Sequence, residues 1–318
     1  MTDDPLFLVA DVGGTNTRVA LARGRRILPD TVHRYGNRDF ANLAPLLTQY
    51  CEDHGRETPD GACVAVAGPV SGGRAELTNL DWSIDTARLI RCTGARRAAI
   101  LNDLQAQGHA LGHLSDSDCL TIVDAPVRND AARLVIGVGT GFNAAPVHLT
   151  HAGRFVPPSE AGHANMPVRT EAELRLCTFV STTHGFPSVE DVLSGRGLEQ
   201  IYRWLASEAG SEDELLASEI MGRIDSDPRA NAAVQQFVRI LGTVAGNLAL
   251  IHLPLGGIYL VGGVARAMAP HLSPMGFDTA FRDKGRFAGF MSNFPVFLIA
   301  DDFAALTGCA AHLVDFPD

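Results

Sequence analysis

Hydrophobic positions gather in short apolar runs near the start, in the middle and near the end of the chain, with amphipathic stretches between them. Short runs such as FLVAD, rich in β-branched or aromatic side chains, are typical of buried strands. Apolar residues three and four positions apart indicate helices with one buried face. The pattern predicts strands at 7–11, 17–22, 62–68, 97–103, 133–139, 143–149, 256–263 and 296–300. It predicts helices at 40–55, 104–114, 170–184, 189–206, 212–224, 231–253 and 303–314.

Strands that alternate with helices favour the α/β class, in which both faces of each sheet are covered. The chain has 318 residues, which is enough for two domains, and no Pro/Ser-rich linker separates its parts. Hydrophobic residues make up 46% and charged residues 19% of the chain, as in ordinary globular proteins. We therefore expect two α/β domains with a compact boundary.

The formal net charge of −10 repels the phosphates of nucleic acids and of anionic membranes, so neither is expected as a partner. The opening MTDDPLF has no basic residue and no long apolar run, and a signal peptide is not expected. The stretch 240–265 has no charged Asp, Glu, Lys or Arg and is long enough to resemble a membrane span. Because His252, Pro254 and two glycines interrupt it, we interpret it as a buried helix, a break and a buried strand.

The cysteines are scattered and none has C-x-x-C spacing, which argues against a zinc ribbon or a redox motif. Unpaired cysteines without a secretion signal suit a reducing cytoplasm. We expect a cytoplasmic protein in which these residues act as small buried hydrophobes.

A stretch near the start reads VADVGGTNTR, an apolar strand that ends in an acid and a glycine turn. It is neither a Walker A loop nor a Rossmann fingerprint, because no G-K-[ST] follows and a strand, not a helix, comes next. In a hairpin tip Gly13 and Gly14 leave room for a phosphate at the backbone N–H groups. Thr15 and Asn16 add donors, and Asp11 is placed to hold Mg²⁺. An ordinary hairpin explains the same residues.

A similar strand–turn–strand pattern recurs in the middle of the chain as VIGVGTGFNAAPVHL. Its Gly139, Thr140 and Gly141 suit a second phosphate, and a plain strand turn is the alternative. Further on, GGIYLVGGVA ends a strand in Gly262 and Gly263, which offer a flat surface for a purine. The repetition suggests a duplicated architecture with two phosphate loops.

The run ILND ends a predicted strand in Asn102 and Asp103, and ligands gather at such strand ends in α/β sheets. A helix N-cap is the alternative for Asp103, and one carboxylate can serve both purposes. In PSEAGHANMP, Glu160 and His163 flank a glycine and suit a hydroxyl-rich ligand better than zinc, for which no third ligand is near. Glu190 in SVEDVLSG is a further acceptor or, alternatively, a first-turn helix acid.

Taken in order, these motifs resemble the bacterial ATP-dependent glucokinases of the hexokinase–actin–sugar kinase superfamily. The resemblance extends over essentially the whole chain and rests on the segments DVGGTN, AGPV, TNLDW, LND, GVGTG, EAGH, VLSGRGLEQIY, GGIYLVGGV and FRDKGRF and on the closing helix. It implies an actin-like ATPase (ribonuclease H-like) fold with two domains and a deep interdomain cleft. The implied small domain spans 1–112 plus 303–318, and the large domain spans 113–302.

The resemblance also implies the reaction, which transfers the γ-phosphate of ATP to the 6-hydroxyl of D-glucose, with Asp103 as general base. The sugar would be held by Asn102, Asp103, Glu160, His163 and Glu190. The first phosphate loop, with Mg²⁺ near Asp11, would comprise Asp11, Gly13, Gly14, Thr15 and Asn16. The second would comprise Gly139, Thr140 and Gly141, and the adenosine would lie on Gly262 and Gly263. The family also implies a homodimer.

The chain departs from the family pattern at the loops. Asn143 in GTGFN stands in place of a glycine, Ala161 replaces a glycine beside the histidine, and Asn165 replaces an aspartate. ADDFAALTG lacks the usual Asn-Pro-Gly, and no cysteine-rich zinc motif follows the histidine, so the chain resembles the zinc-free branch. These departures leave mannose, fructose or an amino sugar open as the substrate. A non-catalytic sugar-binding regulator is disfavoured, because Asp103 is retained.

Overall fold

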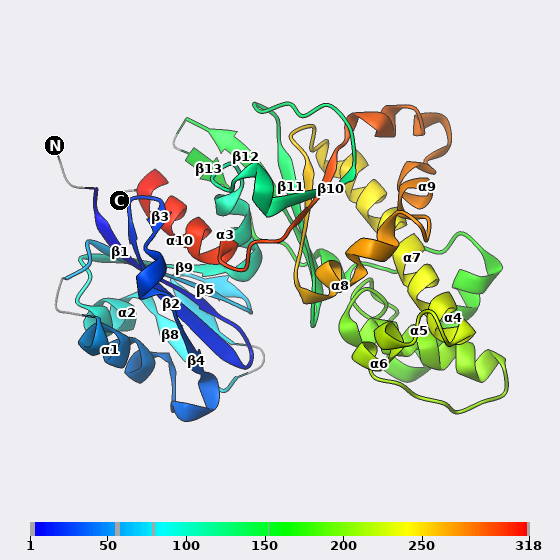
Figure 1. Ribbon diagram of the computed structural model, residues 1–318, viewed down its shortest axis with the longest axis horizontal. Coiled ribbons are helices and arrows are strands. Elements are labelled where there is room, and N and C mark those ends of the chain that lie inside the picture. Colours follow the sequence, from blue (N-terminus) through cyan, green and yellow to red (C-terminus); the bar gives the residue numbers. More distant parts are fainter. Residues whose placement is uncertain (1–3, 55–57, 78–79, 152, 317–318) are drawn as a thin grey trace. The chain divides into compact units, whose positions relative to one another are not determined.

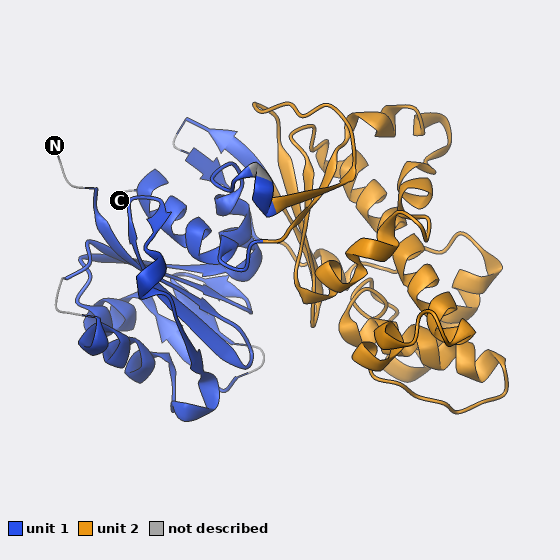
Figure 2. Cartoon of the chain, viewed as in Figure 1, with its two compact units in different colours: residues 1–118, 147–158, 301–318 blue, residues 119–146, 159–300 orange. Residues whose placement is uncertain are grey.

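The computed structural model describes residues 4–54, 58–77, 80–151 and 153–316. The chain divides into two compact units, which Figure 2 colours separately. Unit 1 consists of Met1–Asp118, Val147–Pro158 and Asp301–Asp318, and unit 2 consists of Cys119–Pro146 and Ser159–Ala300. This division groups Val147–Pro158 with unit 1, whereas the sequence-based limits kept that segment in the large domain.

Unit 1 is built on a sheet with the strand order β3-β2-β1-β5-β9, in which β4 also pairs with β2. β1 is antiparallel to β2 and parallel to β5, and β5 is parallel to β9. The strands are β1 (Leu6–Val12), β2 (Asn16–Arg23), β3 (Arg26–Ile27), β4 (His33–Gly36), β5 (Gly61–Val66) and β9 (Arg97–Asn102). A small separate sheet contains β6 (Val70–Ser71), β7 (Arg74–Glu76) and β8 (Ser83–Asp85).

Successive side chains of a strand point to opposite faces of the sheet. The apolar side chains of unit 1 therefore form a hydrophobic core on each face of its sheet. Leu8, Ala10 and Val12 of β1 belong to a core shared with α1 (Leu43–Asp53) and α2 (Thr86–Thr93). Phe7 and Val9 belong to the opposite core, shared with α3 (Asp103–Ala110) and α10 (Ala304–Asp315). Figure 1 shows these helix pairs on the two sides of the sheet.

The last helix, α10, packs closely on α3, as the family resemblance implied for the C-terminal helix. At Gly308 the backbones are so near that a Cβ atom would lie 1.7 Å from the carbonyl oxygen of Ala106, so only glycine fits. One turn further along each helix, His109 Nε2 lies 3.2 Å from His312 Nδ1. Arg97 donates to the carbonyls of Leu313 and Phe316, both at 2.6 Å, and so caps the end of α10.

The second sheet has the order β10-β15-β14-β11-β12-β13, and β11, β14 and β15 are parallel neighbours. Its strands are β10 (Cys119–Val123), β11 (Arg133–Val138), β12 (Phe142–Thr150), β13 (Gly153–Phe155), β14 (Ile258–Val261) and β15 (Val296–Ile299). The last part of β12 and all of β13 belong to unit 1. The helices of unit 2 are α4 (Glu171–His184), α5 (Gly195–Glu208), α6 (Ala217–Gly222), α7 (Pro228–His252), α8 (Gly263–Leu272) and α9 (Phe277–Arg282).

Within the described residues, α7 is the helix long and apolar enough to cross a membrane by length and composition, and 61% of its most apolar window is buried. Its side chains Phe237, Val238 and Leu241 belong to the core of unit 2. The helix ends at His252, and the φ of 47° at the next residue, Leu253, turns the chain towards β14. This confirms the predicted order of a buried helix, a break and a buried strand.

The α/β class is confirmed, and most predicted elements are present within a few residues of their expected ends. The helix expected at 189–206 is wrong at its start, because residues 189–194 form a turn and α5 begins after Ser194. The spacing of apolar residues does not predict α2, α8 and α9, which are short. Single-turn 3-10 helices lie at Pro29–Thr31, Asn37–Asp39, Asp116–Asp118, Ala161–His163, Gly285–Phe287 and Phe290–Asn293.

The packed histidines of α3 and α10 should make unit 1 sensitive to acid. Burial, with smaller effects of neighbouring charges, lowers the pKa of His109 to about 3 and that of His312 to about 4. Arg154 and His113 act on His109 in the same direction as burial, and Asp315 opposes it. The unfolded chain therefore binds more protons than the folded chain below about pH 6.5. The free energy of unfolding should fall as the pH drops from 6.5 towards 4, by up to about 1.4 kcal/mol per pH unit for each ring.

Urea unfolding at pH 6.5, 5.5 and 4.5 measures this effect. His312→Phe removes one titrating ring, and its unfolding free energy should depend less steeply on pH than that of the wild type. The control is His148→Phe at an exposed position of β12, which should keep the wild-type slope. Equal slopes for wild type and His312→Phe would contradict the assignment.

Candidate active site

The first predicted phosphate loop is the tip of the hairpin between β1 and β2, as the sequence indicated. The N–H of Gly13 donates to the carbonyl oxygen of Asn16 at 3.0 Å and closes the turn. Gly14 and Thr15 at the tip are exposed. The turn is therefore accessible, which an anion-binding backbone loop requires.

A buried asparagine holds this loop from behind. The N–H of Asn37 donates to the carbonyl of Thr15 at 2.9 Å, and its Nδ2 donates to the carbonyl of Gly13 at 2.8 Å. Its Oδ1 accepts from Thr17 Oγ1 at 2.8 Å, and the residue is 2% exposed. Sequence reasoning missed Asn37, because only the pairing of β4 with β2 brings it to the loop.

Asp11 lies near the end of β1, opposite Arg18 on β2. Arg18 Nη1 lies 3.7 Å from Asp11 Oδ2 and donates to the carbonyl of Asp302 at 3.3 Å. Burial raises the pKa of Asp11, and the charge of Arg18 partly offsets this rise. Mg²⁺ commonly takes one or two carboxylates and completes its shell with water and phosphate oxygens. The partly accessible carboxylate of Asp11 beside this glycine turn fits that requirement.

The end of β9 places Asn102 and Asp103 at the start of α3. Asn102 Oδ1 accepts from the N–H of Leu104 at 2.9 Å and caps the helix. The N-cap residue is therefore Asn102, and the alternative that assigned this role to Asp103 is wrong by one residue. Asn102 Nδ2 also donates to the carbonyl of Gly68 at 3.1 Å. Asp103 is the first residue of the helix and half-buried, and its Oδ1 accepts from Leu104 N–H at 2.8 Å. The positive end of the helix dipole favours a charged carboxylate there.

Parallel pairing puts Asp11 and Asp103 on one edge of the unit 1 sheet. In register, Asp11 lies beside Ala65, and Ala65 lies beside Leu101. Two strand spacings separate β1 from β9, so the two carboxylate-bearing segments lie on the order of 10 Å apart. This is the edge at which ligands of α/β sheets bind.

The second predicted loop joins β11 to β12 in unit 2. The N–H of Gly139 donates to the carbonyl of Gly141, and the N–H of Gly195 donates to the carbonyl of Gly139, both at 2.9 Å. Glu190 Oε2 accepts from the N–H of Phe142 at 2.9 Å. A Cβ at Gly141 would lie 2.5 Å from that carboxylate oxygen, whereas a Cβ at Gly139 would meet nothing within 4 Å.

Gly262 and Gly263 follow β14, the parallel neighbour of β11, as the sequence predicted, and they lie at the start of α8. Gly262 has a φ of 106°, and its Cβ would lie 2.4 Å from the carbonyl oxygen of Val138 at the end of β11. Gly263 is exposed and has open space around it. The ends of the two strands thus form a surface without side chains beside the second loop.

The segment that carries Glu160 and His163 lies along the turn that carries Glu190. The N–H of Glu190 donates to the carbonyl of Gly162 at 2.9 Å. A Cβ at Gly162 would lie 2.0 Å from the carbonyl oxygen of Phe142, so this glycine allows the segment to touch β12. Glu160 and His163 are exposed, and Glu190 is half-buried in a turn, so the helical alternative for Glu190 is wrong.

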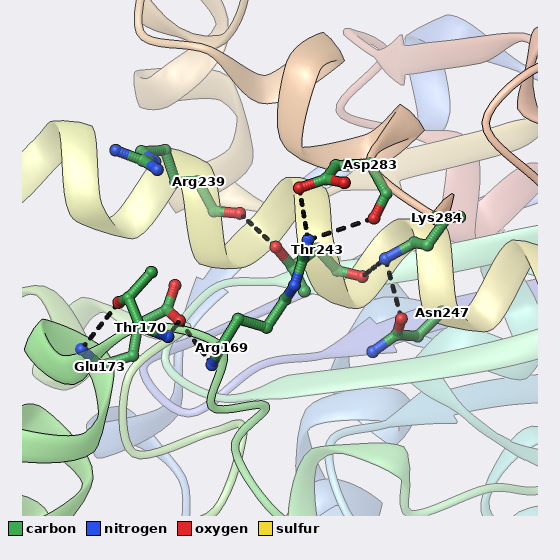
Figure 3. Close-up of polar contacts among 8 residues, drawn as sticks. All are labelled: Arg169, Thr170, Glu173, Arg239, Thr243, Asn247, Asp283 and Lys284. Carbon is green, nitrogen blue, oxygen red and sulfur yellow. Dashed lines mark hydrogen bonds and ion pairs between the residues drawn. The ribbon is translucent and has the colours of Figure 1, made fainter. Parts of the chain in front are cut away.

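A polar network holds the far end of this segment, and Figure 3 shows it. Arg169 Nη1 lies 2.7 Å from Asp283 Oδ2 and donates to its carbonyl at 3.1 Å. Lys284 Nζ donates to the carbonyl of Thr243 at 2.9 Å and to Asn247 Oδ1 at 2.8 Å on α7. Burial lowers the pKa of Lys284 to about 8. The FRDKGRF motif, to which the sequence assigned no role, therefore anchors α7 and the start of α4.

A pocket of about 440 Å³ lies beside this network. It is lined by residues of α4, α7 and α9 that include Glu173, Arg239 and Thr279, and it contains none of the predicted site residues. Its buried carboxylate, Glu173, already accepts from the N–H groups of Arg169 and Thr170 at 2.8 and 2.9 Å. The pocket is thus distinct from the loops described above.

In the part of the chain that the structure describes, no cluster of three or more His, Cys, Asp or Glu side chains could hold a metal. Two residues of the TNLDW motif, Thr78 and Asn79, lie outside the described residues.

A family model described as "Glucokinase" matches residues 8–315. The glucokinase of Rhizobium meliloti (strain 1021) is 33% identical over 311 residues, which cover 96% of this chain and 91% of that protein. The crystal structure of a glucokinase from an Antarctic psychrotroph superposes with a TM-score of 0.89 at 30% identity, covering 98% of this chain and 99% of that one. A glucokinase from Balamuthia mandrillaris, solved in complex with glucose, shares the fold with a TM-score of 0.79 at 22% identity and coverages of 96% and 92%.

These likenesses confirm the resemblance found in the sequence and, with it, the expected actin-like ATPase fold. They extend over nearly the whole chain and nearly the whole length of these two relatives. The chain belongs to the glucokinase family.

Proposed function

We propose that this protein is a glucokinase that transfers the γ-phosphate of ATP to the 6-hydroxyl of D-glucose, giving glucose 6-phosphate and ADP for glycolysis. The observation that carries the proposal is the common sheet edge that holds Asp103, Asp11 and the first glycine turn. The proposed base for the acceptor hydroxyl and the proposed phosphate loop therefore lie at one edge of the unit 1 sheet. The chain also belongs to a family with glucokinase activity.

Asp103 is the proposed general base. Its carboxylate orients the sugar 6-hydroxyl and takes its proton as the hydroxyl oxygen bonds to the γ-phosphorus. The bond from that phosphorus to the β,γ-bridging oxygen breaks, and ADP leaves with the electron pair. Its place on the first turn of α3 supports this role, because the helix dipole stabilises the charged base that the step needs.

The sugar ligands are proposed to be Asn102, Glu160, His163 and Glu190. Glu160 and His163 are exposed and free to accept or donate at hydroxyls. Glu190 uses Oε2 for Phe142, which leaves Oε1 for the sugar, with Arg196 3.9 Å away. Asn102 keeps only part of its amide for a ligand, because the helix cap and Gly68 take the rest.

The proposed nucleotide ligands are the backbone groups of the two glycine turns, with Gly262 and Gly263 under the adenosine. Thr15 and Asn16 add donors in the first turn, and Thr140 in the second. When Mg²⁺ is bound, Asp11 would hold it, and the ion would neutralise charge on the transferring phosphate. Arg18 keeps the carboxylate of Asp11 in place beside that turn.

The same proposal includes a cytoplasmic location and a homodimer. Cys63 of β5 and Cys309 of α10 are buried in the same core of unit 1, and burial raises the pKa of Cys51 to about 11. Thiols of this kind are unreactive, which suits residues that act as packing groups in a reducing compartment. The homodimer rests on the family alone.

Another hexose is the second candidate substrate, because Asn143, Ala161 and Asn165 depart from the family pattern around the sugar ligands. An assay with ATP, Mg²⁺ and glucose, mannose, fructose, glucosamine or N-acetylglucosamine decides between them by kcat/KM. The highest kcat/KM on glucose supports the proposal, and a higher value on another hexose would reassign the substrate. No phosphorylation of any sugar would contradict the kinase activity.

Asp103→Asn should lower kcat about 10²- to 10⁴-fold, because the amide cannot accept the proton. Calorimetric titration should give a glucose Kd within about threefold of the wild type, since Asn is isosteric and can still hydrogen-bond. The control, Asp124→Asn at an exposed loop position, should leave kcat unchanged. A near-normal kcat in folded Asp103→Asn would remove the base assignment.

Glu160→Gln should raise the glucose KM about tenfold, because it replaces a charged acceptor of a sugar hydroxyl by a neutral one. The KM for ATP should stay within about twofold. Glu171→Gln, at an exposed position in the first turn of α4, is the matched control and should change neither constant. An unchanged glucose KM in Glu160→Gln would exclude its contact with the sugar.

The two glycines of the second loop provide a matched pair. Gly139→Ala meets no protein atom within 4 Å, so it should keep the wild-type Tm and raise the KM for ATP, since only a ligand needs that space. Gly141→Ala displaces the Glu190 carboxylate from the N–H of Phe142 and should lower stability by about 1–2 kcal/mol. Thermal unfolding and ATP kinetics of both variants test this, and the reverse ranking in Tm would refute it.

A further inference from the structure

Asn143 departs from the family glycine, and its side chain is the contact between β12 and the segment that carries Glu160. Its Nδ2 donates to the carbonyl of Ser159. Its Oδ1 accepts from the N–H of Ala161 at 2.9 Å and from its own neighbour Ala144 at 2.8 Å. The chemistry of the partners fixes the amide orientation, since a carbonyl needs the donor and the N–H groups need the acceptor.

The two long-range partners of Asn143 flank Glu160 in the chain. Ser159 precedes Glu160 and Ala161 follows it, so the backbone of Glu160 is fastened on both sides. The Glu160 side chain itself is exposed. The backbone sets the position from which that side chain extends, and Asn143 holds the backbone on both sides of it.

A second departure from the family pattern lies at the same contact. Ala161 stands where the family has glycine, its N–H is the one bonded to Asn143, and its methyl group packs against the core of unit 2. Replacing glycine by alanine where the backbone allows it narrows the unfolded ensemble and stiffens a loop. Both departures thus act in the same direction, towards a more rigid segment around Glu160.

Other contacts hold other parts of the segment, and they do not hold the backbone on both sides of Glu160 as Asn143 does. The N–H groups of Glu190 and Val189 donate to the carbonyls of Gly162 and Ala164, both at 2.9 Å, after the Glu160 position. Arg169 fastens the far end through Asp283 (Figure 3). Within the described residues, Asn143 is the side chain bonded to the backbone on both sides of Glu160.

We propose that Asn143 is a positioning residue that holds Glu160 for the sugar, so that glucose affinity in this protein depends on a side chain where the family has a glycine. The proposal rests on the proposed glucokinase function. It makes Asn143 a determinant of sugar binding without contact between Asn143 and the sugar.

The test compares Asn143→Gly, which restores the family residue, with Asn143→Asp, which keeps the size and both acceptor bonds. Asn143→Gly should raise the glucose KM and the calorimetric glucose Kd about tenfold, because the bonds on both sides of Glu160 are lost. Asn143→Asp should raise them less than Asn143→Gly but above the wild type, since a carboxylate oxygen then faces the Ser159 carbonyl. The KM for ATP and kcat should stay within about twofold in both variants.

Two controls separate positioning from general loosening. Asn129→Gly, at an exposed turn of unit 2, should leave the glucose KM unchanged. Ala161→Gly keeps the N–H that bonds to Asn143 and should raise the glucose KM less than Asn143→Gly. Glu160→Gln combined with Asn143→Gly should raise the glucose KM less than the product of the single effects, because both act through one carboxylate.

Each outcome of this experiment has a defined meaning. If the wild type phosphorylates glucose and the glucose KM and Kd are unchanged in Asn143→Gly, the role of Asn143 is overturned. The glucokinase function is then left intact. A parallel rise of the glucose and ATP KM with a lower Tm also overturns it, because that is the signature of a loosened unit 2. A wild type inactive on glucose would instead overturn the proposed function and the sugar role of Asn143 with it.

Discussion

Parallel strand pairing is the constraint on which both halves of the candidate site depend. In unit 1 the register of β1, β5 and β9 brings the ends of distant segments to one sheet edge, although 91 positions of sequence separate Asp11 from Asn102 (102 − 11). In unit 2 the parallel pair of β11 and β14 does the same for the second glycine turn and Gly262. Side-chain packing fixes these registers, because a one-residue slip would move each side chain to the opposite face of its sheet.

The glycines of the site fall into two groups with different physical reasons. Gly141, Gly162 and Gly262 touch neighbouring protein atoms so closely that a Cβ does not fit, so the protein itself requires them. Gly139 and Gly263 have open space where a side chain would stand. No neighbouring protein atom requires glycine at these two positions, and the proposed contacts with the nucleotide would account for it. A sequence motif cannot make this distinction, because both groups appear simply as G.

The local part of this structure could be predicted from the sequence, and the part that depends on tertiary contacts could not. The β1–β2 hairpin, the strand that ends at Asn102 and the break after α7 follow from short apolar runs and from glycine and proline signals. Asn37 has no such signal, because its role arises when β4 pairs with β2. Glu190 was assigned an alternative in a helix because apolar residues near it have helical spacing, but its carboxylate and N–H are taken by Phe142 and Gly162. Tertiary hydrogen bonds override local propensity there.

The position of the proposed base depends in turn on the last helix of the chain. Asp103 begins α3, and α3 lies on the unit 1 sheet with α10 packed against it. The contact has little freedom to adjust, because Gly308 meets the backbone of Ala106 and His109 meets His312. A change that pushes α10 outward must therefore displace α3 or open a cavity beneath it, and interiors packed to this density tolerate neither well. The position of Asp103 thus depends on α10, which begins about 200 positions later in the sequence.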